Sequence, residues 1–150
     1  MRGTGSVECN KNGAPVLSNS GVLAVYDGVY LRSVDEKDNG HYVAVNHGVM
    51  NIFNGTFSSP GGLSSLIENG YYNYNSGDSS TGYVEGLNDE RPILQVFGGT
   101  FINNYVTIKN DDGARCIIES GNLMGMIFNT GRDLIIKGGT FTATDGYENI

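Results

Sequence analysis

The segment at residues 94–101 reads Leu-Gln-Val-Phe-Gly-Gly-Thr-Phe, and the segment at 134–141 reads Leu-Ile-Ile-Lys-Gly-Gly-Thr-Phe. Residues 23–30 and 50–57 follow the same template, and residues 116–123 are a degenerate copy. The template is an apolar residue, any residue, Val or Ile, two further residues, Gly, Thr and an aromatic residue. Its first and third positions share one face of a strand, because side chains alternate along a strand. We expect the glycine to turn the chain at positive φ and the aromatic ring to return to the interior on the next strand.

A second short element precedes three of these copies. Residues 16–21, 43–48 and 126–131 each read as an apolar strand closed by Asn-x-Gly. Asparagine tolerates left-handed backbone, and its side chain can bond local amides, so this pattern indicates a turn. In a stacked repeat, asparagines at equivalent turns can form a ladder, which would place Asn19, Asn46 and Asn129 above one another.

The spacing of the copies sets the size of one coil. The anchor glycines at 28, 55, 99, 121 and 139 are 27, 44, 22 and 18 residues apart. Gaps of 18 to 27 suit a coil of about three short strands, at roughly 3.3 Å per residue. The gap of 44 fits two coils or one coil with an insertion, in which residues 64–70 supply a strand and residues 71–88 form a protruding loop. The sequence therefore predicts one all-β solenoid domain over residues 1–150, of about five or six coils.

Composition supports strands and excludes several functional classes. The chain has 23 glycines, three prolines, no tryptophan and a net charge of −7. It has no basic stripe for nucleic acid, no apolar run near the roughly 20 residues of a membrane span and no apolar core of a secretory signal. Cys9 and Cys116 are too few and too far apart for a disulfide framework or a zinc site, so we expect two buried free thiols.

The Gly-Gly-Thr-Phe copies at 98–101 and 138–141, with Asn-Gly-Thr-Phe at 54–57, resemble the repeats of pectin-lyase-like proteins. The resemblance implies a single-stranded, right-handed parallel β-helix, as in bacterial surface proteins and phage tailspike or decoration proteins. That family includes polysaccharide lyases, glycoside hydrolases, adhesins and purely structural modules. The resemblance therefore implies the architecture and leaves the activity open.

An enzymatic reading would use Asp111, Asp112 and Arg115, since hydrolysis of this kind needs paired carboxylates facing one cleft. Polygalacturonase-like enzymes carry an Asp-Asp motif, then Gly-His-Gly, then Arg-Ile-Lys. Here Asn46-His47-Gly48 comes before Asp111-Asp112, and Arg-Ile-Lys is absent. An Asn-Asp-Asp-Gly run between strands is ordinarily a turn, so this catalytic set is the alternative interpretation and not the main one.

We expect no metal and no cofactor. The acidic segment 35–40 fails the calcium-loop spacing, because Lys37 stands where a ligand should be. His41 and His47 have no third metal-binding residue nearby in the sequence, and His47 reads as an exposed turn residue. No glycine-rich segment has phosphate-loop spacing.

The predicted loop is the best candidate for recognition. It is rich in Tyr, Asn, Ser and Gly, the residues that binding loops favour. Tyrosine offers area for stacking against sugar rings or protein surfaces, with a hydroxyl for hydrogen bonding. The candidate binding residues are Tyr71, Tyr72, Tyr74 and Tyr83, with glycans or other surface proteins as partners.

These observations favour a non-enzymatic structural or binding module over a polysaccharide lyase or hydrolase. Unpaired cysteines and the lack of a signal peptide fit folding in a cytosol, and a phage virion protein is made inside the cell and works outside it. We therefore expect a virion surface component, of the decoration, fibre or tailspike type, or a surface adhesion module. Open solenoid ends need a cover, which predicts either a homo-oligomer, often three-fold in this class, or a segment of a longer solenoid.

Overall fold

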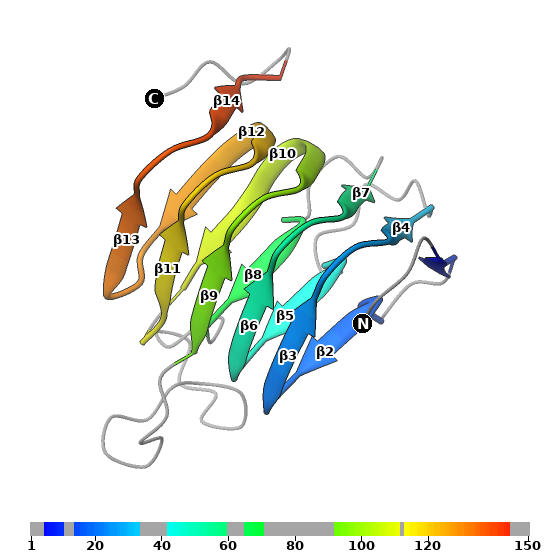
Figure 1. The fold of residues 1–150 in the computed structure, drawn as a ribbon, viewed down its shortest axis with the longest axis horizontal. Helices are drawn as coiled ribbons and strands as arrows, with labels where there is room; N and C mark the ends of the chain where they lie inside the picture. Colours follow the sequence, from blue (N-terminus) through cyan, green and yellow to red (C-terminus); the bar gives the residue numbers. More distant parts are fainter. Residues whose placement is uncertain are drawn as a thin grey trace.

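The computed structural model describes residues 5–10, 14–33, 42–59, 65–70, 92–111 and 113–144. Within these residues the chain is all-β, as predicted, and every strand pair in them is parallel. Nothing in this part of the chain is a helix long and apolar enough to cross a membrane. Figure 1 shows the strands arranged as a strongly curled sheet along which the chain advances from one end to the other.

The strands fall into three stacks, which the chain visits in a fixed order. The second stack holds the strands that begin the repeated template and lies across the front of Figure 1. Its members in spatial order are β3 (Val22–Val25), β6 (Val49–Ile52), β9 (Ile93–Val96), β11 (Arg115–Ile118) and β13 (Asp133–Ile136). Equivalent template positions are paired throughout this stack, so the repeat found in the sequence is the register of the sheet.

The other two stacks share two long strands. The first stack holds the asparagine-ended strands β2 (Leu17–Asn19), β5 (Ala44–Asn46) and β8 (Ile67–Asn69), followed by the second halves of β10 (Thr100–Asn110) and β12 (Asn122–Asn129). The third stack holds β1 (Ser6–Cys9), β4 (Val29–Arg32), β7 (Thr56–Ser59), the first halves of β10 and β12, and β14 (Thr140–Thr142). β10 and β12 pass from the third stack to the first through irregularities in their register. We call each passage through the first, second and third stacks a repeat, and the described strands make five of them.

The anchor glycines turn the chain from the second stack into the third. Gly28, Gly55, Gly99, Gly121 and Gly139 all have φ between 107° and 138°. A Cβ at Gly99 would lie 2.8 Å from the carbonyl oxygen of Gly55 in the repeat before. Both the backbone angle and the close stacking of repeats therefore require glycine here, and the predicted positive φ is confirmed.

The inward face of the third stack carries a column of rings. Tyr30, Phe57 and Phe101 are buried, with ring centroids 4.7 and 5.2 Å apart. We call these three residues the inner aromatic column, and Leu123 continues it in the fourth repeat, also fully buried. This confirms that the last template position returns to the interior.

The fifth repeat departs from the prediction of a fully buried interior. Phe141 is 43% exposed and Ile136 is 50% exposed, although their counterparts in the preceding repeats are buried. Both side chains stand last in their rows, because β13 and β14 each pair with only one neighbouring strand among the described residues.

Two further predictions concern the insertion and the cysteines. β8 is the strand expected within residues 64–70, whereas the expected loop at 71–88 lies outside the described residues. Both cysteines are free, as predicted, and burial raises the pKa of the Cys116 thiol to about 12. Cys9 is only half-buried, which corrects the expectation that both thiols are interior.

Replacing a ring at the last template position should cost more stability where the ring is buried than where it is exposed. We expect Phe101→Ala to lower the free energy of unfolding by about 3–5 kcal/mol, because it empties a closed site between two neighbours. Phe141→Ala should cost only about 1–2 kcal/mol, because its ring already meets solvent. Urea unfolding of both variants measures the difference, and equal losses would contradict the assignment of Phe141 to an open row end.

Candidate functional site

The described candidate residues lie at one corner of the molecule, where the chain turns from the first stack into the second. His47 stands in this turn in the second repeat, Asp111 stands in it in the fourth, and Arg115 begins the strand that follows. In the third repeat the chain leaves this corner at Gly70 and returns at Pro92. Tyr71, Tyr72, Tyr74 and Tyr83 fall between these two points and lie outside the described residues. We call this region the asparagine corner.

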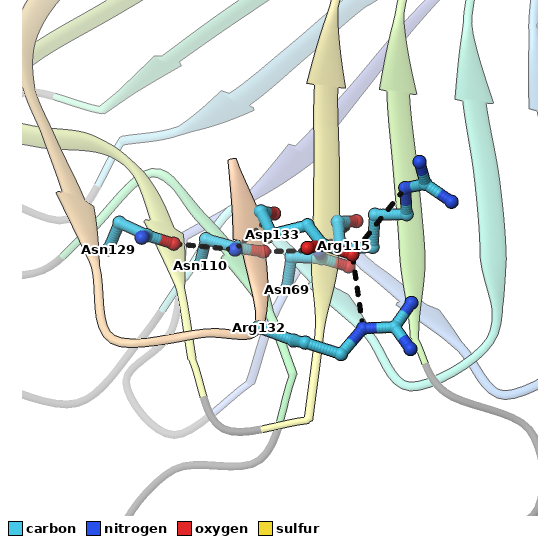
Figure 2. A network of polar contacts seen from close by, with 6 residues as sticks. All are labelled: Asn69, Asn110, Arg115, Asn129, Arg132 and Asp133. Carbon is cyan, nitrogen blue, oxygen red and sulfur yellow. Dashed lines mark hydrogen bonds and ion pairs between the residues drawn. The ribbon is translucent and has the colours of Figure 1, made fainter. Parts of the chain in front are cut away.

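A continuous chain of amide hydrogen bonds forms the frame of the corner. Each asparagine donates from Nδ2 to Oδ1 of the next repeat, at 2.7 to 2.8 Å. Its members, in order, are Asn19, Asn46, Asn69, Asn110 and Asn129, and Figure 2 shows the last three. The expected stacking of Asn19, Asn46 and Asn129 is confirmed, although Asn69 and Asn110 stand between Asn46 and Asn129.

The ladder also fastens each turn to its neighbour. The amide of Asn46 donates to the carbonyl of Gly48 in its own turn and to that of Ile93 in the next repeat, both at 3.0 Å. Asn69 and Asn110 make the equivalent bonds to the carbonyls of Arg115 and Asp133 in the repeats that follow them. Bonds in such a chain polarise one another in a water-poor setting, so we expect each bond of the ladder to strengthen its neighbours.

The carboxylate of Asp111 forms an ion pair through one oxygen and accepts a hydrogen bond through the other. Lys109 Nζ lies 2.7 Å from Oδ2, and the hydroxyl of Thr130 donates to Oδ1 at 2.8 Å. The Asp111 side chain is only 9% exposed. Lys109 is also the register partner of Glu68, which is buried. This arrangement joins the fourth and fifth repeats and neutralises the charge of Asp111.

Arg115 belongs to a different set of ionic contacts. Arg115 Nε lies 3.8 Å and Arg132 Nε 3.1 Å from the same oxygen of Asp133, so two guanidinium groups flank one carboxylate (Figure 2). All three side chains are 39–44% exposed, so solvent weakens these pairs. Asp111 and Arg115 thus share a turn but contact different partners. Asp112 lies outside the described residues, so the proposed catalytic set stays a prediction.

His47 is less exposed than the sequence suggested. It is half-buried at the corner, and this desolvation lowers the pKa of its imidazole below the ordinary value. The described residues contain no group of three or more His, Cys, Asp or Glu side chains that could hold a metal ion. The acidic segment 35–40 lies outside them.

A second column of rings, which was not predicted from the sequence, lies on the outside of the molecule. Tyr26, Phe53 and Phe97 stack with ring centroids 4.9 Å apart in both pairs and interplanar angles of 6° and 7°. They are 37–40% exposed and form what we call the outer aromatic column. The signal was present, because the fourth template position is aromatic in three successive copies. Glu119 and Lys137 occupy that position in the last two repeats and form an ion pair at 2.8 Å.

Breaking the asparagine ladder at its middle should destabilise the protein strongly. Asn46→Ala leaves Asn19 Nδ2 and Asn69 Oδ1 without their ladder partner, and we expect a loss of about 2–4 kcal/mol in the free energy of unfolding. Asn129→Ala is the matched control, because Asn129 is exposed at the end of the ladder and should cost less than about 1 kcal/mol. Chemical denaturation of both variants tests this, and similar small losses would show that the ladder contributes little.

The depressed pKa of His47 predicts a dependence of stability on pH. The unfolded chain binds a proton at this residue more readily than the folded chain does. Its contribution is therefore fully present above about pH 7 and is lost as pH falls through the ordinary value of about 6.5 and on through the folded pKa. His47→Thr, which copies Thr130 at the equivalent position, should flatten the fall in melting temperature between about pH 7.5 and 5. Parallel melting curves for the two proteins would contradict this.

Comparison of the sequence with known proteins gave no match. The sequence matches no family model, no curated protein and no solved structure. The resemblance to pectin-lyase-like repeats therefore rests on the repeat residues themselves and on the parallel, curled sheet that they form.

Proposed function

We propose that the chain is a rigid, non-enzymatic structural and binding module of a virion or cell surface, built as a right-handed parallel β-helix of five or six coils. The observation that carries this proposal is that residues of the same kind stack on one another in successive repeats. The asparagine ladder, the inner aromatic column and the anchor glycines all run through successive repeats in register. Such a rod resists bending, and its outward positions are free to vary.

The handedness follows from a general rule of chain geometry. Connections between parallel strands of one sheet are right-handed in nearly all proteins, because a twisted strand packs back onto the sheet in that sense. Five passages in the same order, each adding one strand to each stack, suit a single-stranded helix. The resemblance of the Gly-Gly-Thr-Phe segments points the same way.

The contacts of Asp111 support a structural role for the asparagine corner. A general acid or nucleophile must be free to meet substrate, but both oxygens of Asp111 are held by Lys109 and Thr130. Recognition would then fall to groups outside the corner, and the candidates from the sequence are Tyr71, Tyr72, Tyr74 and Tyr83. The apolar side chains exposed at Ile136 and Phe141 favour contact with a second copy, a trimer being the form common in this class, or with a neighbouring surface protein.

An assay for turnover of polysaccharide separates this proposal from the lyase or hydrolase alternative. We expect no new reducing ends and no unsaturated products from a panel of acidic and neutral polysaccharides. Asp111→Asn and Arg115→Ala should therefore leave every signal unchanged. Depolymerisation by the unaltered chain that disappears in Asp111→Asn would overturn the proposal, provided that the variant still melts cooperatively.

A further inference from the structure

We propose that Asn54 is a site of spontaneous deamidation, at which the folded chain converts its own side-chain amide into aspartate and isoaspartate with water as the only co-reactant. Asn54 precedes Gly55 in the turn that leads from the second stack to the third. This inference is independent of the proposed function, because it concerns the chemistry of the turn and needs no ligand.

The reaction begins when the main-chain nitrogen of Gly55 attacks Cγ of Asn54. A bond forms between these two atoms, the bond from Cγ to Nδ2 breaks, and the proton lost by the nitrogen leaves with Nδ2 as ammonia. Water then opens the five-membered imide. Cleavage between the nitrogen and Cγ gives aspartate, and cleavage between the nitrogen and the main-chain carbonyl carbon gives isoaspartate. Glycine favours the attack because it has no Cβ to hinder close approach.

The attacking nitrogen of Gly55 is not held by the protein. Gly55 is buried on its Cα side, where an added Cβ would lie 3.5 Å from the ring of Phe57. Its carbonyl accepts from the amide of Thr100 at 2.8 Å, but its own N–H donates no hydrogen bond within the described residues. An amide hydrogen without a protein partner must meet water, because orphaned buried amides are rare. Solvent base can therefore remove this proton, which the attack requires.

The side chain of Asn54 can turn towards that nitrogen. It is exposed, and its Nδ2 makes a long contact of 3.5 Å to Asp27 Oδ1. The first repeat shows what this turn allows, because Gly28 has a φ of 125° against 129° at Gly55, and its N–H donates to Oδ1 of Asp27 at 2.8 Å. A side chain folded in this way brings its Cγ against the nitrogen. Asn54 therefore reaches the geometry of attack by rotation of an exposed side chain, which is a fast motion.

A second Asn-Gly pair, Asn69 and Gly70, lies in a turn that blocks the reaction. Asn69 is fully buried, and its Nδ2 donates to Asn110 Oδ1 at 2.8 Å and to a carbonyl of the next repeat at 3.0 Å. The N–H of Gly70 donates to the carbonyl of Asn46 at 3.0 Å. The attacking nitrogen and the leaving amide are therefore both held. The asparagine ladder thus protects Asn69, whereas Asn54 lies outside the ladder.

Deamidation would weaken the contacts between the first three repeats. Asp27 Oδ1 would face a carboxylate in place of an amide donor, so that an attractive contact becomes a repulsive one. Isoaspartate also adds one methylene group to the main chain just before Gly55, whose carbonyl accepts from Thr100 in the third repeat. There is little room for displacement, because a Cβ at Gly99 would lie only 2.8 Å from that carbonyl oxygen.

The test is incubation of the folded full chain in mildly alkaline buffer made with heavy-oxygen water, followed by peptide mapping with mass spectrometry. Each deamidated site gains one heavy oxygen atom, and chromatography separates its aspartate and isoaspartate forms. We expect Asn54 to react at least about tenfold faster than Asn69, because the bonds that hold Asn69 must open first. In concentrated urea the two sites should react at similar rates. Asn12 and Asn39, which precede glycines outside the described residues, are mapped separately.

The control is Asn54→Ser, which copies Ser120 at the equivalent position of the fourth repeat. It should abolish the label at this position and leave the slow labelling of Asn69 unchanged. The inference is overturned if Asn54 stays intact in the folded chain while the chain in urea deamidates there. It is also overturned if Asn54 and Asn69 react equally fast in the folded chain.

Asn54→Asp supplies the aspartate product directly and tests its effect on the fold. It should melt at a lower temperature than Asn54→Ser at low ionic strength, and the difference should shrink in high salt, which screens the repulsion from Asp27. Equal melting temperatures at low ionic strength would refute that repulsion.

Discussion

The structure depends on one constraint, which is that parallel strands in register place equivalent side chains directly above one another. Residues that tolerate a copy of themselves as neighbour are therefore well suited to such rows. Asparagine satisfies this condition because its side chain donates and accepts at once, so each amide completes the next along the ladder. Aromatic rings satisfy it by stacking, and glycine satisfies it by leaving room for the backbone of the adjacent repeat.

The same constraint explains why the fold could be predicted from the sequence. The template positions at 23–30, 50–57, 94–101 and 134–141 state the register directly, and the pairs observed in the second stack follow it. The ladder was harder to complete, because the Asn-x-Gly pattern is interrupted by the insertion after Asn69 and by the two aspartates after Asn110. The register of the strands decides which asparagines join the ladder. The local turn sequence indicates this only in part.

The candidate site could be predicted less well, because sequence proximity does not fix the partners of a side chain. Asp111 and Arg115 are four residues apart, yet Asp111 contacts Lys109 and Thr130, whereas Arg115 faces Asp133. Both Thr130 and Asp133 belong to the next repeat along the chain. The outer aromatic column was not predicted for a related reason. The fourth template position varies between copies, so no contact between its side chains was expected.

The two aromatic columns show how one packing rule produces both stability and an exposed surface. In the inner column the ring edges meet other core side chains, so its contribution is burial of apolar area. In the outer column the ring faces are already satisfied by stacking, so the edges remain exposed at little cost to the fold. The replacement of rings by Glu119 and Lys137 in the last two repeats shows that stacking at this position is not required to continue the sheet. The rings in the first three repeats therefore contribute stacking and partial burial of apolar area, and the ion pair takes over this row where the column ends.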